Sequence, residues 1–154
     1  MTDGNPIKPP PARALAEALH AGQTDKGGTP YSAHLAAVSA ILLRRWPDAP
    51  DYVVDAAWLH DAIEDTDATP ESLAASGVST HTIEIVQAVT RPAHLTYLVW
   101  IAELAASGNV WAIRVKLADN EHNSDPSRTL PGSDIVERRY LPARLVLEEA
   151  LTDG

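Results

Sequence analysis

The chain has 154 residues, 45% of them hydrophobic, and a formal net charge of −9. This length and composition are typical of one globular domain, and the acidic charge argues against non-specific binding to nucleic acid or to an anionic membrane. Because the sequence contains no cysteine, disulfides and thiolate metal sites are excluded.

The beginning of the chain is polar and rich in proline. We expect a flexible segment over residues 1–10, followed by a single domain over residues 11–154. The segment lacks the order of a signal peptide, in which positive charges precede an apolar stretch. The most apolar stretch, residues 98–106, contains Glu103 and is too short to cross a membrane. We therefore expect a cytoplasmic protein that binds neither a membrane nor nucleic acid.

Apolar residues at helical spacing, bounded by proline, glycine and capping residues, predict helices along most of the chain. One predicted helix begins at Pro11, and five more cover residues 32–45, 51–63, 95–107, 110–123 and 134–151. A short helix is predicted to begin at Thr69 and end at Gly77, and another is predicted to be capped by Thr80. Pro142 predicts a kink or break within the last of them. No stretch of useful length alternates as a strand does, so the predicted fold is all-α, a compact helical bundle with short connections.

Two histidines and two aspartates in three of these segments are candidate ligands of one divalent cation: His34, His60, Asp61 and Asp119. Imidazole nitrogens and carboxylate oxygens suit Mn²⁺, Fe²⁺, Co²⁺ or Zn²⁺. All four residues lie in otherwise apolar helices, where a buried acid or histidine needs a partner that a shared cation would provide. Each residue alone is as well explained by a core hydrogen bond or a helix cap, so the prediction depends on their combination.

Two further acids, Glu64 and Asp65, follow His60 and Asp61 by four residues each. A continuous helix would place them one turn beyond these ligands, on the same face. A carboxylate in that position could act as general base or acid on a water activated by the metal. The alternative is a solvated acidic helix end, because Asp67 lies close by in the sequence.

At these residues the sequence resembles the hydrolase domain of bifunctional alarmone synthetase/hydrolase proteins. Residues 20–34 (HAGQTDKGGTPYSAH) resemble the opening motif of that domain, residues 60–66 (HDAIEDT) its HD and ED motifs, and residues 116–119 (KLAD), with His122 and Asn123, its third motif. The motifs occur in the family's order. A chain of this length has no room for the synthetase and regulatory domains, so it is most similar to the free-standing small alarmone hydrolases of the HD phosphohydrolase superfamily.

The resemblance implies an HD-domain phosphohydrolase fold and an enzyme of the guanosine-3′,5′-bis(diphosphate) 3′-pyrophosphohydrolase type. Such an enzyme usually uses Mn²⁺ and releases pyrophosphate from (p)ppGpp, leaving GDP or GTP. The implied partner is therefore a small nucleotide, and a homodimer remains open. Carried over residue by residue, the resemblance makes His34, His60, Asp61 and Asp119 the metal ligands, Glu64 and Asp65 the acid/base pair, and Lys26, Tyr31 and Asn123 the substrate contacts.

The first loop departs from the family's pattern. Many members have Arg-Lys where this chain has Asp25-Lys26, and the arginine stacks on the guanine base. An aspartate cannot stack as a guanidinium does, and it would repel phosphate. An adenine alarmone such as (p)ppApp, another nucleotide such as NADPH, and a non-catalytic nucleotide-binding domain therefore stay open as alternatives. The stretch after Asn123 departs too, and there Arg128 is either a replacement phosphate contact or a solvated loop residue.

Overall fold

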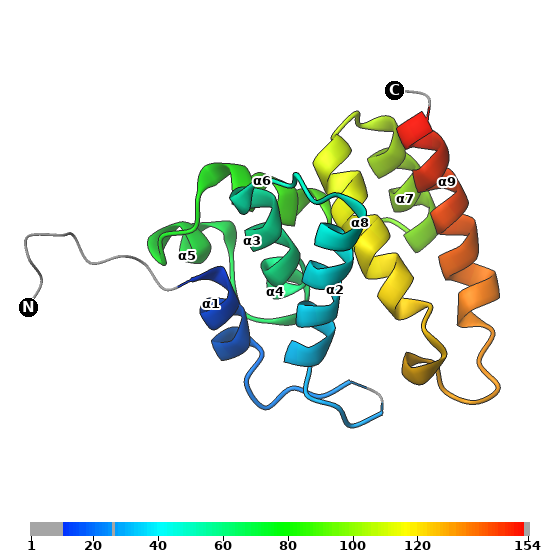
Figure 1. Ribbon diagram of the computed structural model, residues 1–154, viewed down its shortest axis with the longest axis horizontal. Coiled ribbons are helices and arrows are strands. Elements are labelled where there is room, and N and C mark those ends of the chain that lie inside the picture. The colour runs from blue at the N-terminus through cyan, green and yellow to red at the C-terminus, as the bar shows by residue number, and fades with distance from the viewer. Residues whose placement is uncertain (1–10, 26, 153–154) are drawn as a thin grey trace, which may run out of the picture.

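A computed structural model describes residues 11–25 and 27–152, which form an all-helical fold and contain no strand, as predicted (Figure 1). The helices are α1 (Ala12–Leu19), α2 (Ser32–Arg45), α3 (Asp51–Leu59), α4 (Ala62–Asp65), α5 (Pro70–Ala75), α6 (Thr80–Ala88), α7 (Tyr97–Ala106), α8 (Val110–Asn123) and α9 (Leu141–Thr152). A 3₁₀ turn at Pro126–Arg128 and a π-helical turn at Val136–Tyr140 lie between α8 and α9. The predicted flexible segment at residues 1–10 lies outside the described residues.

Helix α8 is central to the packing, between α2 on one side and α7 and α9 on the other (Figure 1). Its buried residues lie on several of its faces, which is typical of a helix enclosed by others. The core around it includes Leu35, Val38, Leu42, Val53, Leu59, Ile113, Leu117 and Leu147, each at most 2% exposed. This packing brings α8 against the first turns of α2 and the end of α3. Among the described residues, no helix combines the length and apolar character needed to cross a bilayer.

Capping residues set several of the helix boundaries. α2 and α8 begin and end where the sequence predicts. At the start of α5, the Thr69 side chain accepts a hydrogen bond from the Ser72 backbone N–H and the Ser72 side chain accepts one from the Thr69 N–H, which is a capping box. The prediction that Thr80 caps α6 is wrong. Ser79 precedes it, and the Ser79 hydroxyl accepts the hydrogen bond from the Thr82 N–H, so Thr80 is the first helical residue.

The predicted helix over residues 51–63 is interrupted at His60 and Asp61, so that α3 ends at Leu59 and α4 begins at Ala62. The reason lies in a side chain. The His60 ring nitrogen Nδ1 donates to the Ala57 carbonyl oxygen at 2.7 Å, and this oxygen would otherwise accept the next hydrogen bond of the helix. The break turns both His60 and Asp61 toward α2 and α8.

The last predicted helix, residues 134–151, is also divided. Its first part is the π-helical turn, closed by a hydrogen bond from the Leu141 N–H to the Val136 carbonyl oxygen, and α9 follows. Pro142 lies in the first turn of α9, where a residue without an N–H is tolerated. Pro142 therefore lies where the wide π-helical turn changes to the regular α-helix, in agreement with the predicted kink or break at this residue.

Asn120 joins this wide turn to α8, and we expect its removal to destabilise the fold. Its side chain is fully buried, donates to the Tyr140 carbonyl oxygen at 2.8 Å and accepts from Arg144 Nε at 3.0 Å. Replacing Asn120 by alanine leaves both partners unpaired, so the free energy of unfolding should fall by about 1–3 kcal/mol. Urea denaturation followed by circular dichroism measures it. The exposed control Glu103→Ala should stay within about 0.5 kcal/mol of the parent, and equal losses in both variants would contradict the assignment.

Candidate metal centre

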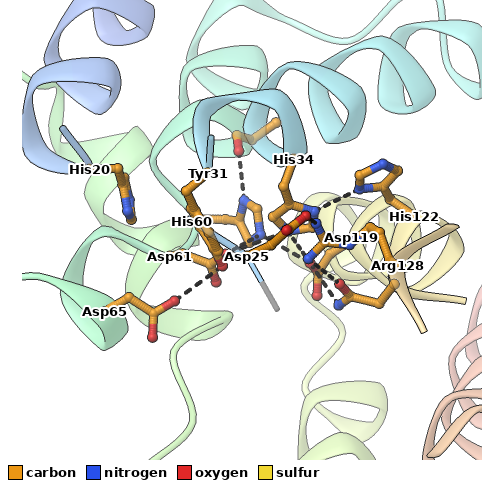
Figure 2. A network of polar contacts seen from close by, with 12 residues as sticks. His20, Asp25, Tyr31, His34, His60, Asp61, Asp65, Asp119, His122 and Arg128 are labelled. Carbon is orange, nitrogen blue, oxygen red and sulfur yellow. Dashed lines mark hydrogen bonds and ion pairs between the residues drawn. The ribbon is translucent and has the colours of Figure 1, made fainter. Parts of the chain in front are cut away.

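Four side chains from three separate segments converge at one point of the structure (Figure 2). His34 comes from the first turn of α2, His60 and Asp61 from the break between α3 and α4, and Asp119 from α8. One candidate ligand atom from each lies within 4.8 Å of the others. All four residues are buried, with Asp61 the most exposed at 8%. The structure therefore brings together the four residues that the sequence proposed as ligands.

The atoms that face one another are two imidazole nitrogens and two carboxylate oxygens. His34 Nε2 lies 3.0 Å from Asp119 Oδ1 and 3.5 Å from Asp61 Oδ2. His60 Nε2 lies 3.1 Å from each of the same two oxygens. Buried nitrogen and oxygen donors in this arrangement fit a divalent cation of the transition-metal type. The donor set agrees with a divalent metal site and leaves the identity of the metal open.

The outward-facing nitrogens of both histidines are already used. His60 Nδ1 donates to the Ala57 carbonyl oxygen, and His34 Nδ1 lies 2.8 Å from His122 Nδ1. Burial and the nearby His34 and Arg128 lower the pKa of His122 to about 4, so its ring is neutral near pH 7 and can accept this hydrogen bond. Hydrogens held on Nδ1 leave both Nε2 atoms free to bind a cation, which is the usual arrangement of metal-binding histidines.

The site concentrates negative charge that the protein balances with its own cations. Burial would raise the pKa of Asp119, but Lys116 and His60 hold it well below its usual value, and Lys116 Nζ donates to Asp119 Oδ2 at 2.7 Å. Burial would lower the pKa of His60, but the carboxylates of Asp61 and Asp119 raise it well above its usual value. In the absence of a metal, His60 therefore holds a proton that a bound cation would displace.

We expect metal affinity to increase with pH for this reason. His60 has a raised pKa, so it is protonated through the neutral range and must lose its proton before Nε2 can bind the cation. Affinity should therefore rise from pH 6 to pH 8, by up to about tenfold per pH unit for each proton displaced. Calorimetric titration of Mn²⁺ in buffers of different ionisation enthalpy measures both the affinity and the protons released. Affinity that is constant with pH, with no proton release, would contradict this expectation.

The two candidate acid/base residues lie beside the cluster on α4. Despite the break between α3 and α4, Asp65 still lies one helical turn after Asp61, because the Asp65 N–H donates to the Asp61 carbonyl oxygen at 2.9 Å. Partial burial and the charge of Asp61 raise the pKa values of both Glu64 and Asp65. The Tyr31 hydroxyl lies 2.6 Å from Asp61 Oδ2 and 3.2 Å from Asp65 Oδ2, so it connects a candidate metal ligand to a candidate acid.

A cavity of about 500 Å³ opens beside this cluster. The predicted residues Tyr31, Asn123 and Arg128 line it together with Glu64 and Asp65, whereas Lys26 lies outside the described residues. The Asn123 side chain donates to Asp119 Oδ1 at 3.1 Å, so this predicted substrate contact also supports a candidate ligand. The positively charged side chains of the lining are Arg91, Lys116, Arg128 and Arg139. Five acidic residues also line the cavity, namely Asp25, Asp61, Glu64, Asp65 and Asp119, so the four cations offset most of this negative charge at the place where a phosphate group would bind.

Sequence reasoning did not find Arg91 or Arg139. Arg91 lies just after α6, and its guanidinium donates to the Leu95 carbonyl oxygen at 3.1 Å. Arg139 lies in the π-helical turn, with its guanidinium carbon 4.7 Å from the centre of the Tyr97 ring. Neither residue is part of a recognisable motif, so no local signal could have placed it at the cavity.

Comparisons with known proteins agree with this geometry. Residues 12–122 match a family model described as HD domain. A probable guanosine-3′,5′-bis(diphosphate) 3′-pyrophosphohydrolase of Synechocystis sp. is 33% identical over 121 residues, which cover 73% of this chain and 16% of that protein. The bifunctional (p)ppGpp synthase/hydrolase SpoT of Escherichia coli K12 is 36% identical over 149 residues, covering 89% and 20%. The chain thus spans a fifth or less of the length of these curated relatives.

A solved structure resembles nearly the whole chain. It is described as a metazoan ortholog of SpoT that hydrolyzes ppGpp and plays a role in starvation responses. The two structures superpose with a TM-score of 0.69 at 25% sequence identity, over 92% of each chain. The likeness therefore extends over more of the chain than the residues that match the HD domain model.

Proposed function

Since the chain belongs to the HD domain family, we propose that it is a metal-dependent phosphohydrolase that removes the 3′-pyrophosphate of an alarmone nucleotide. The substrate would be (p)ppGpp or (p)ppApp, and the products pyrophosphate and the corresponding 5′-phosphorylated nucleoside. The observation that carries the proposal is the buried His/His/Asp/Asp cluster beside a cavity whose lining adds the carboxylates of Asp25, Glu64 and Asp65 and four cationic side chains. The activities named for the relatives support the same reaction class.

We assign the metal-binding role to His34, His60, Asp61 and Asp119, and propose Mn²⁺ as the cation. Such an ion, when bound, supplies Lewis acidity that activates water and offsets phosphate charge. The protein's own contribution begins with holding these ligands in a buried, preorganised arrangement. Lys116 keeps Asp119 ionised, and the hydrogen bonds at the two Nδ1 atoms hold the imidazole rings in place.

Glu64 and Asp65 would move the protons of the reaction. As water attacks the phosphorus next to the ribose, a P–O bond forms and the bond from phosphorus to the 3′-oxygen breaks. One of the two, as a carboxylate, takes a proton from the water, and the other, as a carboxylic acid, gives a proton to the 3′-oxygen as it leaves. The raised pKa values of both groups favour this exchange nearer to neutral pH than ordinary carboxyl groups would allow. Lys26, Tyr31, Asn123 and Arg128 are the proposed substrate contacts.

Purified protein supplied with Mn²⁺ and either ppGpp or ppApp tests the proposal, with released pyrophosphate as the readout. Release from at least one of the two is expected. A metal-loaded protein that releases pyrophosphate from neither, but removes a phosphate from NADPH, would replace the alarmone by another nucleotide. Nucleotide binding without turnover of any substrate, unchanged by Glu64→Gln, would indicate a non-catalytic binding domain instead.

A further inference from the structure

Asp25 forms an ion pair with Arg128 at the wall of the cavity (Figure 2). The two residues are 103 positions apart, and Arg128 Nη1 lies 3.2 Å from Asp25 Oδ2. Both side chains are largely buried, at 16% and 15% exposure. An ion pair shielded from solvent in this way is held more firmly than one on an open surface. The pair is therefore part of the cavity's structure, and the acid that the sequence marked as repulsive has a cationic partner.

The Asp25 carboxylate is fixed by its own loop. Its Oδ1 atom accepts hydrogen bonds from the backbone N–H groups of Gly27 and Thr29, both at 2.9 Å. Gly28 lies within the same turn at φ +86°, a conformation that favours glycine. With Oδ1 engaged by the turn, Oδ2 remains for Arg128. Asp25 is thus a rigid anchor whose position is set by the backbone of the loop.

The Arg128 guanidinium is held at two of its nitrogens and has donors left over. Nη2 donates to Asn123 Oδ1 at 3.3 Å, in addition to the contact of Nη1 with Asp25. The Nε atom is buried and has no hydrogen-bond partner among the described residues. Asn123 in turn donates to Asp119, so Arg128 lies two hydrogen bonds away from a candidate metal ligand. Arg128 also lines the same cavity as His34, Asp61 and Asp119, so a ligand group bound at the metal centre would share this cavity with the guanidinium.

We propose that Asp25 is a positioning residue, which holds the Arg128 guanidinium so that its free donors bind a diphosphate group at the metal centre. The inference rests on the proposed function for the nature of the ligand. A guanidinium makes paired, charge-assisted hydrogen bonds to phosphate oxygens, and these require a defined orientation. Fixing a long side chain in advance also removes part of the entropy that binding would otherwise cost. On this basis Asp25 aids phosphate binding, although its own charge opposes it.

A double-mutant cycle tests this inference, with Asp25→Asn, Arg128→Ala and the double variant. Asparagine keeps the Oδ1 acceptor for the loop and removes the charge that binds Arg128. The probe is inorganic pyrophosphate, titrated calorimetrically into Mn²⁺-loaded protein. Each single variant should weaken its binding by about tenfold, and Asp25→Asn should add little once Arg128 is gone. Arg128→Lys, which keeps the charge without the two-pronged contact, should restore only part of the affinity.

The control is Asp48→Asn, which removes the same charge from an exposed loop and should leave pyrophosphate affinity unchanged. Tighter binding by Asp25→Asn would mean that Asp25 only repels phosphate, and additive effects in the double variant would mean that the two residues act separately. Either result overturns the inference. A third result that overturns it is an Arg128→Ala variant whose affinity for pyrophosphate is normal but whose preference between GDP and ADP is altered. The test measures binding and does not depend on turnover. A protein that hydrolyses no alarmone can therefore still show the expected coupling between Asp25 and Arg128, and an active enzyme can lack it.

Discussion

Replacing Asp119 by asparagine should abolish binding of the divalent cation and lower the rate of alarmone hydrolysis by about a thousandfold. Asp119 Oδ1 lies 3.0 Å from His34 Nε2 and 3.1 Å from His60 Nε2, so it faces both candidate imidazole ligands at once. An amide carries no charge and binds divalent cations more weakly than a carboxylate. The stabilisation of transition-state charge by a catalytic metal is worth several kcal/mol, and each 1.4 kcal/mol corresponds to about tenfold in rate.

Two measurements check this prediction: the metal content of the purified protein, by mass spectrometry, and kcat/KM with added Mn²⁺. Asp67→Asn is a suitable control because it removes an exposed acid close to α4. It should retain both metal and activity. Because Asp119→Asn also takes the charged partner from Lys116, thermal melting without metal shows whether the variant is folded. A folded Asp119→Asn protein that binds one metal ion per chain would contradict the assignment of Asp119 as a ligand.

The parts of the fold that sequence reasoning predicted well depend on short-range signals. α2 carries a continuous stripe of apolar residues and ends two residues before Pro47. α8 is preceded by Gly108 and Asn109, and the Asn109 side chain caps the helix by accepting a hydrogen bond from the Ala112 N–H. Such residues define helix ends through interactions with their neighbours in the sequence. The quartet of candidate ligands was recognisable for a similar reason, since its members lie within three short motifs whose order matches a known family.

The features that the sequence did not reveal all depend on contacts between distant segments. The interruption after Leu59 results from the direction of the His60 ring, which burial against α2 and α8 determines. The π-helical turn depends on Asn120, 20 residues earlier, which binds the Tyr140 carbonyl oxygen. The interpretation of Asp25 as a residue that repels phosphate changes most, because its ion-pair partner Arg128 lies beside it only in the folded chain. Propensity and spacing contain no information about such pairs.

Replacing Glu64 by glutamine should reduce kcat by about 10²–10⁴-fold and leave Mn²⁺ affinity nearly unchanged. Glu64 lines the cavity but is not one of the four converging candidate ligands. Its Oε1 atom accepts a hydrogen bond from the Arg91 backbone N–H at 3.3 Å, which a glutamine oxygen can also accept. The variant therefore removes the ability to exchange a proton and preserves the local contact. Calorimetric Mn²⁺ titration and steady-state kinetics separate the two effects.

The pH profile distinguishes Glu64 from its neighbour. Partial burial, together with the charge of Asp61, raises the pKa of the Glu64 carboxyl. A base is active only when deprotonated, so activity should be lost as pH falls through this raised pKa, at a higher pH than an ordinary glutamate would give. Glu64→Gln should remove that acid limb, whereas Glu71→Gln, the same change on the exposed surface of α5, should leave it intact. If the limb persists in Glu64→Gln and disappears in Asp65→Asn, then Asp65 takes the proton from water and Glu64 does not.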